Sequence, residues 1–160
     1  MVGFAPLALV SSVVINSPSA AAVGLREQFE RLCIAPNSVE EIAAAASNEL
    51  WIELAPASES DIPRIFAPDG HDFPTLVVAL NKRTNETWAT CTVYDPSVSR
   101  EHLIKATSER FGDYQLMETG DDIAWVDTDG QPIVGREVRV SSFENESEQR
   151  VLALSVRKAL

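Results

Sequence analysis

Two cysteines far apart in the sequence limit how this chain can fold. Cys33 lies at the joint between two predicted helices, and Cys91 lies in a predicted strand over residues 87–94. Side chains alternate between the two faces of a strand, so helices that cover one face would lie beside Cys91. Cys91 would then point toward Cys33. The pattern favours a fold with helices on one face of a sheet.

The chemical state of the cysteines depends on the compartment of the protein. In an exported protein an even number of cysteines is typical of a disulfide, and we favour a structural bridge between Cys33 and Cys91. Two buried free thiols are the alternative in a reducing compartment. A metal site is the other alternative, but His71 and His102 do not lie at zinc-finger or zinc-ribbon spacing.

Residues 1–22 have the features of a secretory signal peptide. Phe4 to Ile15 form an uncharged, mostly apolar run that is too short to span a bilayer but long enough for a signal-peptide core. Ala20 and Ala22 supply the small side chains of an Ala-x-Ala cleavage site. We therefore expect cleavage after Ala22, a mature domain over residues 23–160, and a periplasmic or secreted protein with no stable membrane insertion.

One part of a typical signal peptide is missing from the N-terminus. No charged side chain occurs before Arg26, so the basic segment that usually precedes the apolar run is absent. A start codon placed too late would explain this absence. The alternative is that the apolar run is a buried strand or helix of a cytosolic protein.

The rest of the chain carries helix and strand patterns in an order typical of an α+β domain. Helical signals cover residues 24–32, 38–50 and 95–111, and strand-like runs cover 51–54, 75–80, 87–94, 114–117, 123–126, 133–140 and 151–156. Ser38 and Glu41 form a capping box for the second helix, and Asp95 or Ser97 is expected to cap the third. The order predicts one antiparallel β-sheet with helices packed on one face.

The net charge restricts the class of partner. The chain has a formal net charge of −11, so it would repel nucleic acid and anionic lipid surfaces rather than bind them. Charge of this size serves solubility or attracts a basic partner. We therefore expect no nucleic-acid partner.

Short motifs of known catalytic and cofactor sites are absent from the sequence. The glycines do not form a dinucleotide or phosphate-binding pattern, and neither Gly-x-Ser-x-Gly nor His-Glu-x-x-His occurs. Asp121, Asp122, Asp127 and Asp129 surround Trp125, but their spacing does not fit an EF-hand and is typical of acidic hairpin turns. We therefore predict no catalytic residue, no cofactor and no metal site.

Residues 56–74 are predicted to form a long, proline-rich, irregular stretch. Long loops are uncommon in compact domains and are often functional. This one carries Arg64, His71 and Asp72, which we take as candidate binding residues. Together with Asp69, His71 and Asp72 also resemble an acid–base trio, although no nucleophile accompanies them.

The strand over 87–94 offers a second candidate surface. Trp88, Thr90, Thr92 and Tyr94 share the face opposite to Cys91. Exposed aromatic side chains on a sheet often mark a binding surface, so Trp88 and Tyr94 are further candidate binding residues. A second packed face of the sheet is the alternative.

Several landmarks of the chain together resemble a group of known proteins. These landmarks are Phe29-x-x-x-Cys33, the alanine-rich helix that ends near Trp51, and the run Trp88-Ala89-Thr90-Cys91. The arrangement resembles small secreted proteins of uncharacterised function that are common in Gram-negative bacteria. The resemblance implies a periplasmic or secreted setting and a bridge between the two cysteines, and it brings no activity.

These features together lead to one leading hypothesis about function. We expect an exported, acidic, non-enzymatic binding module whose partner is a basic protein, such as a basic secreted enzyme that it inhibits, or a small ligand. The alternatives are a hydrolase-like enzyme that uses His71 and nearby aspartates, and a structural envelope protein.

Overall fold

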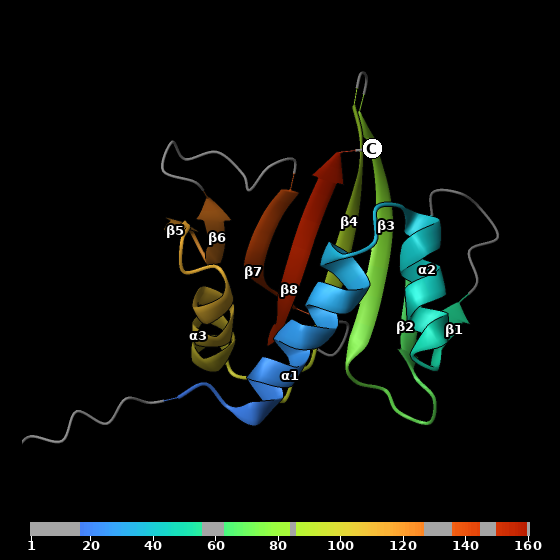
Figure 1. Ribbon diagram of the computed structural model, residues 1–160, viewed down its shortest axis with the longest axis horizontal. Helices are drawn as coiled ribbons and strands as arrows, with labels where there is room; N and C mark the ends of the chain where they lie inside the picture. The colour runs from blue at the N-terminus through green and yellow to red at the C-terminus, as the bar shows by residue number, and fades with distance from the viewer. Residues whose placement is uncertain (1–16, 56–62, 84–85, 127–135, 145–149, 160) are drawn as a thin grey trace, which may run out of the picture.

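The computed structural model describes residues 17–55, 63–83, 86–126, 136–144 and 150–159. These residues form an eight-stranded antiparallel sheet, and all of the helices lie on one face of it (Figure 1). The predicted α+β class with helices on one face is therefore confirmed. Within the described ranges, no helix has the length and hydrophobicity needed to cross a membrane.

The chain forms helices and then four strands, followed by one more helix and four more strands. The helices are α1 (Ala20–Phe29), which continues into the π-helical turn η1 (Glu30–Ile34), α2 (Val39–Asn48) and α3 (Arg100–Arg110). The strands are β1 (Trp51–Ala55), β2 (Arg64–Pro68), β3 (Thr75–Arg83), β4 (Glu86–Tyr94), β5 (Gln115–Thr119), β6 (Asp122–Val126), β7 (Arg136–Glu144) and β8 (Arg150–Ala159).

The sheet consists of two meanders that join at its centre. Its strand order is β1-β2-β3-β4-β8-β7-β6-β5, so consecutive strands pair within each meander and β4 pairs with β8 between them. We call β1–β4 the N-terminal half-sheet and β5–β8 the C-terminal half-sheet. A helix directly precedes each half-sheet in the chain, α2 the first and α3 the second. The two halves thus repeat one arrangement around the β4–β8 junction.

The core lies between the helical layer and the sheet. In Figure 1, α1 crosses in front of the central strands, and it packs against β4, β8 and α3. α2 packs on β1 at one end of the sheet, and α3 packs on β7 toward the other. Large side chains that are almost completely buried come from helices and strands of both halves: Phe29, Leu32, Ile42, Phe66, Leu76, Val93, Leu103, Trp125, Val138, Val140 and Leu154.

The disulfide attaches the helical layer to the sheet. Cys33 lies in η1 and Cys91 in β4, their Cα atoms are 5.5 Å apart, and both side chains are buried. The bridge spans 58 residues of sequence. Both the predicted bridge and the predicted direction of Cys91 toward the helices are confirmed, and the free-thiol and metal alternatives are excluded for this pair.

The helix caps agree with the sequence in one case and differ in another. Ser38 Oγ accepts a hydrogen bond from the Glu41 N–H at 3.1 Å, so the predicted cap of α2 is confirmed. The expected cap of α3 at Asp95 or Ser97 is wrong, because the helix begins later and is capped by Ser99. Asp95 instead accepts hydrogen bonds from the Ser97 N–H and hydroxyl in the preceding turn.

The predicted irregular stretch over residues 56–74 contains a strand, and this expectation was therefore wrong in part. β2 pairs with β1 on one side and β3 on the other, and it buries Phe66 in the core. Pro63 and Pro68 flank or end this strand, where a missing N–H does least harm to a sheet. The prolines therefore made the segment resemble a loop, although their positions at the ends of the strand are compatible with β2.

The first described residues bear on the expected signal cleavage. α1 begins at Ala20, Ser19 Oγ accepts a hydrogen bond from the Ala22 N–H at 3.2 Å, and Ala22 is completely buried. Cleavage after Ala22 would therefore remove the cap and first turn of α1. The apolar run over 4–15, Asp127 and Asp129 lie outside the described residues, and the signal boundary stays a prediction.

Candidate functional site

The face of the sheet opposite to the helices is the candidate site, and we call it the open face. On β4, Ala89, Cys91 and Val93 are buried in the core, whereas the intervening Trp88, Thr90, Thr92 and Tyr94 are only partly buried. This alternation confirms that β4 presents two different faces. Figure 1 shows helices over one of them only.

Residues of neighbouring strands extend the open face in rows across the sheet. Thr92 pairs with Val77 on β3 and with Ser155 on β8, and Ser155 in turn pairs with Arg139 on β7. A parallel row runs from Ala79 through Thr90 and Arg157 to Glu137. Along these two rows the open face changes from apolar on β3 to hydroxyl-bearing at the centre of the sheet and charged on β7.

Trp88 and Arg157 form a contact between the half-sheets. The Arg157 guanidinium carbon lies 4.1 Å from the centroid of the Trp88 ring, a cation–π arrangement. Next to it, the Asn81 amide donates a hydrogen bond to Thr90 Oγ1 at 3.1 Å. A partly buried indole, a cation and oriented hydroxyl and amide groups provide the kinds of contact that dominate protein interfaces.

Tyr94 forms a second aromatic centre at the other end of β4. Its ring lies 5.9 Å from that of Phe73 in an edge-to-face arrangement, and Phe73 is exposed. Tyr94 is six residues from Trp88 on one strand, which corresponds to a separation of about 20 Å. The two predicted aromatic residues therefore share one face but form separate centres.

Arg64 lies away from the open face. It is on β2, opposite the buried Val78, and its guanidinium donates two hydrogen bonds of 2.8 Å to the Glu53 carboxylate. The hydrogen bonds that Arg64 donates to Glu53 raise the pKa of Arg64. Its guanidinium carbon also lies 5.2 Å from the Phe66 ring centroid. The structure therefore places Arg64 in an ion pair that links β2 to β1.

His71 and Asp72 lie in the exposed turn between β2 and β3. The His71 N–H donates to the Pro68 carbonyl oxygen at 3.0 Å, and the Asp72 carbonyl oxygen accepts from the Thr75 hydroxyl at 2.9 Å. Both contacts use main-chain atoms and shape the turn. In the part of the chain that the structure describes, no three His, Cys, Asp or Glu side chains are placed to hold a metal ion.

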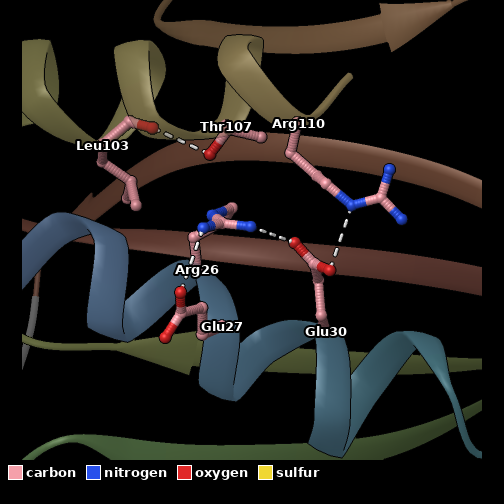
Figure 2. A network of polar contacts seen from close by, with 6 residues as sticks. All are labelled: Arg26, Glu27, Glu30, Leu103, Thr107 and Arg110. Atoms are coloured by element: carbon pink, nitrogen blue, oxygen red, sulfur yellow. Dashed lines mark hydrogen bonds and ion pairs between the residues drawn. The ribbon is translucent and has the colours of Figure 1, made fainter. Parts of the chain in front are cut away.

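A polar network between α1 and α3 was not anticipated from the sequence. Figure 2 shows Glu30 between two arginines: it accepts from Arg26 at 2.6 Å and from Arg110 at 3.1 Å. Arg26 is only 17% exposed. The spacing of Arg26 and Glu30 by four residues on one helix is a signal that predicts the first pair, whereas the second depends on the fold. This network holds the two helices together.

The two edges of the sheet carry exposed apolar side chains that were not predicted from the sequence. Leu50, Ile52 and Leu54 lie at or next to β1, and Leu116 and Met117 lie on β5. A short run of apolar and polar residues in the sequence does not show whether the strand it forms lies at the edge of a sheet. Only the strand order reveals these residues as edge residues.

Comparisons with protein-family models, with curated proteins and with solved structures found no match to this chain. Its function is therefore inferred from its own residues.

Proposed function

We propose that this chain is an exported, non-enzymatic binding protein that recognises a partner protein with the open face of its sheet. The observation that carries this proposal is the open face itself, where Trp88, Thr92 and Tyr94 are partly buried and no described helix covers them. An extended sheet face suits a protein partner better than a small molecule, because small-molecule sites are concave.

The disulfide supports the export part of the proposal. A buried bridge between Cys33 and Cys91 is typical of proteins that fold in an oxidising compartment. The apolar N-terminal run and the resemblance to small secreted proteins point to the same compartment. These features support a location in the periplasm or the medium as part of the proposal.

Site-specific photocrosslinking tests the binding role. A photoreactive amino acid replaces Thr92 at the centre of the open face in cells of the native host, and the matched control replaces the exposed Glu109 on α3. We expect one discrete protein adduct from position 92 in the extracytoplasmic fraction and none from position 109. Adducts from position 109 alone, or from neither position, would contradict the proposal.

The two alternative functions predict different results in companion assays. Replacing His71 by Ala leaves the adduct from position 92 unchanged if the open face binds the partner, because His71 lies in the separate turn between β2 and β3. A measured turnover that His71→Ala abolishes would support the hydrolase instead. Stable recovery of the whole population in washed envelope fractions would support a structural envelope protein.

A further inference from the structure

The two edge strands of the sheet differ in how they are protected. β5 pairs with β6 in an unbroken register from Gln115–Val126 to Thr119–Asp122, and in the described chain it has a neighbour on one side only. Edge strands of stable monomers usually carry a bulge, a lysine or a proline that discourages further pairing. β5 has no bulge, lysine or proline, its one charged side chain is that of Glu118, and it is exposed along its whole length.

β1, at the opposite edge, has the protection that β5 lacks. Its register with β2 shifts between Glu53 and Ala55, which is a bulge or irregularity that interrupts regular pairing. Trp51 is buried beneath the helical layer, and Glu53 is held by Arg64 in the neighbouring strand. The edges are therefore not equivalent, although both carry exposed apolar side chains.

The side chains of β5 could contact an added strand on both faces of the sheet. Leu116 lies opposite Trp125 on the side of the helices, and Met117 lies opposite Ala124 on the open face. Leu116 is 51% exposed. An added strand would place its own side chains within contact distance of both residues.

The charge near β5 selects between the possible occupants of this edge. Glu118 and the nearby Asp113 are exposed and form no ion pair with another described residue. A second copy of a chain with net charge −11 would bring further negative charge to this edge, whereas a basic segment would be attracted. Charge complementarity therefore favours a partner with basic residues.

We propose that β5 docks an extended segment of a partner protein by β-strand addition, and that this segment has apolar residues opposite Leu116 and Met117 and a basic residue opposite Glu118. Main-chain hydrogen bonds to the free edge would supply affinity, and the side-chain pairs would supply specificity. This edge is a different surface from the centre of the open face. Either proposal can therefore fail without the other.

A synthetic peptide tests the edge directly. The probe is acetyl-Thr-Lys-Val-Val-Thr-Lys-amide. In one control peptide glutamate replaces each lysine, and in the other alternate backbone nitrogens are methylated. We expect the lysine peptide to shift the NMR amide signals of residues 115–119, and both controls to bind at least about fivefold more weakly. Equal binding of the lysine and glutamate peptides, or shifts confined to other strands, would overturn the proposal.

Two matched variants separate the two edges. Leu116→Lys should weaken binding of the lysine peptide by about fivefold, because it removes an apolar contact and adds a like charge. Ile52→Lys makes the same change at β1, where the side chain is 47% exposed, and should leave the affinity within about twofold. An equal loss in both variants would overturn the assignment to β5.

Sedimentation of the free protein tests whether a second copy of the chain occupies the β5 edge. We expect a monomer at the concentrations used for the peptide titration. A dimer that Leu116→Lys dissociates, while Ile52→Lys does not, would show that a second copy occupies the edge and would overturn the proposal of a basic segment. The amide spectrum of each variant, taken first, shows that both remain folded.

Discussion

The two half-sheets share one arrangement but are attached to their helices in different ways. In the N-terminal half-sheet, η1 is bonded covalently to β4 through Cys33–Cys91, and α2 covers the edge strand β1. In the C-terminal half-sheet, α3 is joined to α1 by the ion pairs around Glu30, and β5 is exposed along its length. The first half carries the covalent attachment to the helical layer, and the second carries the exposed edge strand.

This difference indicates a division of roles within one sheet. Because β4 and β8 pair along seven registered positions, the covalent attachment of β4 also helps to hold β8, the strand of the C-terminal half-sheet that lies next to it. The second half can therefore keep an exposed edge without a disulfide of its own.

Removal of the disulfide should cause the largest loss of stability. The double variant Cys33→Ala with Cys91→Ala releases a loop of 58 residues in the unfolded chain, and we expect about 4 kcal/mol less free energy of unfolding. Urea unfolding followed by circular dichroism measures the change. Reductant should destabilise the wild-type protein by a similar amount and leave the variant unchanged, whereas a loss below about 1 kcal/mol would mean that packing alone fixes the helices.

Disruption of the α1–α3 network should have a smaller effect. Glu30→Ala leaves the guanidinium of Arg26, which is 17% exposed, with only its longer 3.4 Å contact to Glu27, and we expect a loss of about 2 kcal/mol. Glu49→Ala is the matched change at the C-cap of α2, where the partner Arg31 is 53% exposed, and should cost less than about 1 kcal/mol. Equal losses in urea unfolding would show that the network is no more than a surface contact.

The helix caps should show the smallest difference between the halves. Ser38→Ala removes the 3.1 Å cap of α2 and should cost about 1 kcal/mol, because the freed N–H of Glu41 loses its acceptor. Ser99→Ala removes the longer 3.4 Å contact at α3 and should cost less. Thermal unfolding at fixed pH compares the two, and a larger loss at Ser99 would reverse the ranking.

Local signals in the sequence predicted much of the fold. The N-cap at Ser38, the alternation along the strand over 87–94 and the position of Cys33 between two helices all describe short segments, and the structure confirms each of them. The second hydrogen bond of the expected capping box differs, because the Glu41 carboxylate accepts from the Asn37 N–H rather than from the Ser38 N–H. The helix that begins at Ala20 was expected to begin at residue 24, since the alanines ahead of it were assigned to a cleavage site. The same alanines fit both a cleavage site and the start of a helix, and choosing the cleavage site placed the predicted helix start too late.

Features that depend on distant residues were not predictable in the same way. β2 was read as a loop because Pro63 and Pro68 mask a strand whose support comes from β1 and β3. The pairing of Arg64 with Glu53 follows from that strand pairing, so Arg64 was taken for an exposed residue of a loop. The order of the strands, which exposes β5, depends on the β4–β8 contact and leaves no local pattern in the sequence.

The most direct test of this account is the intact mass of the protein recovered from its native host, alkylated with and without prior reduction. If the protein is exported and its helical layer is bonded to its sheet, the recovered chain lacks the apolar N-terminal segment and is expected to begin at Val23. Its cysteines are then alkylated only after reduction. A mass that retains Met1, with both cysteines alkylated before any reduction, would contradict the export and the bridge together.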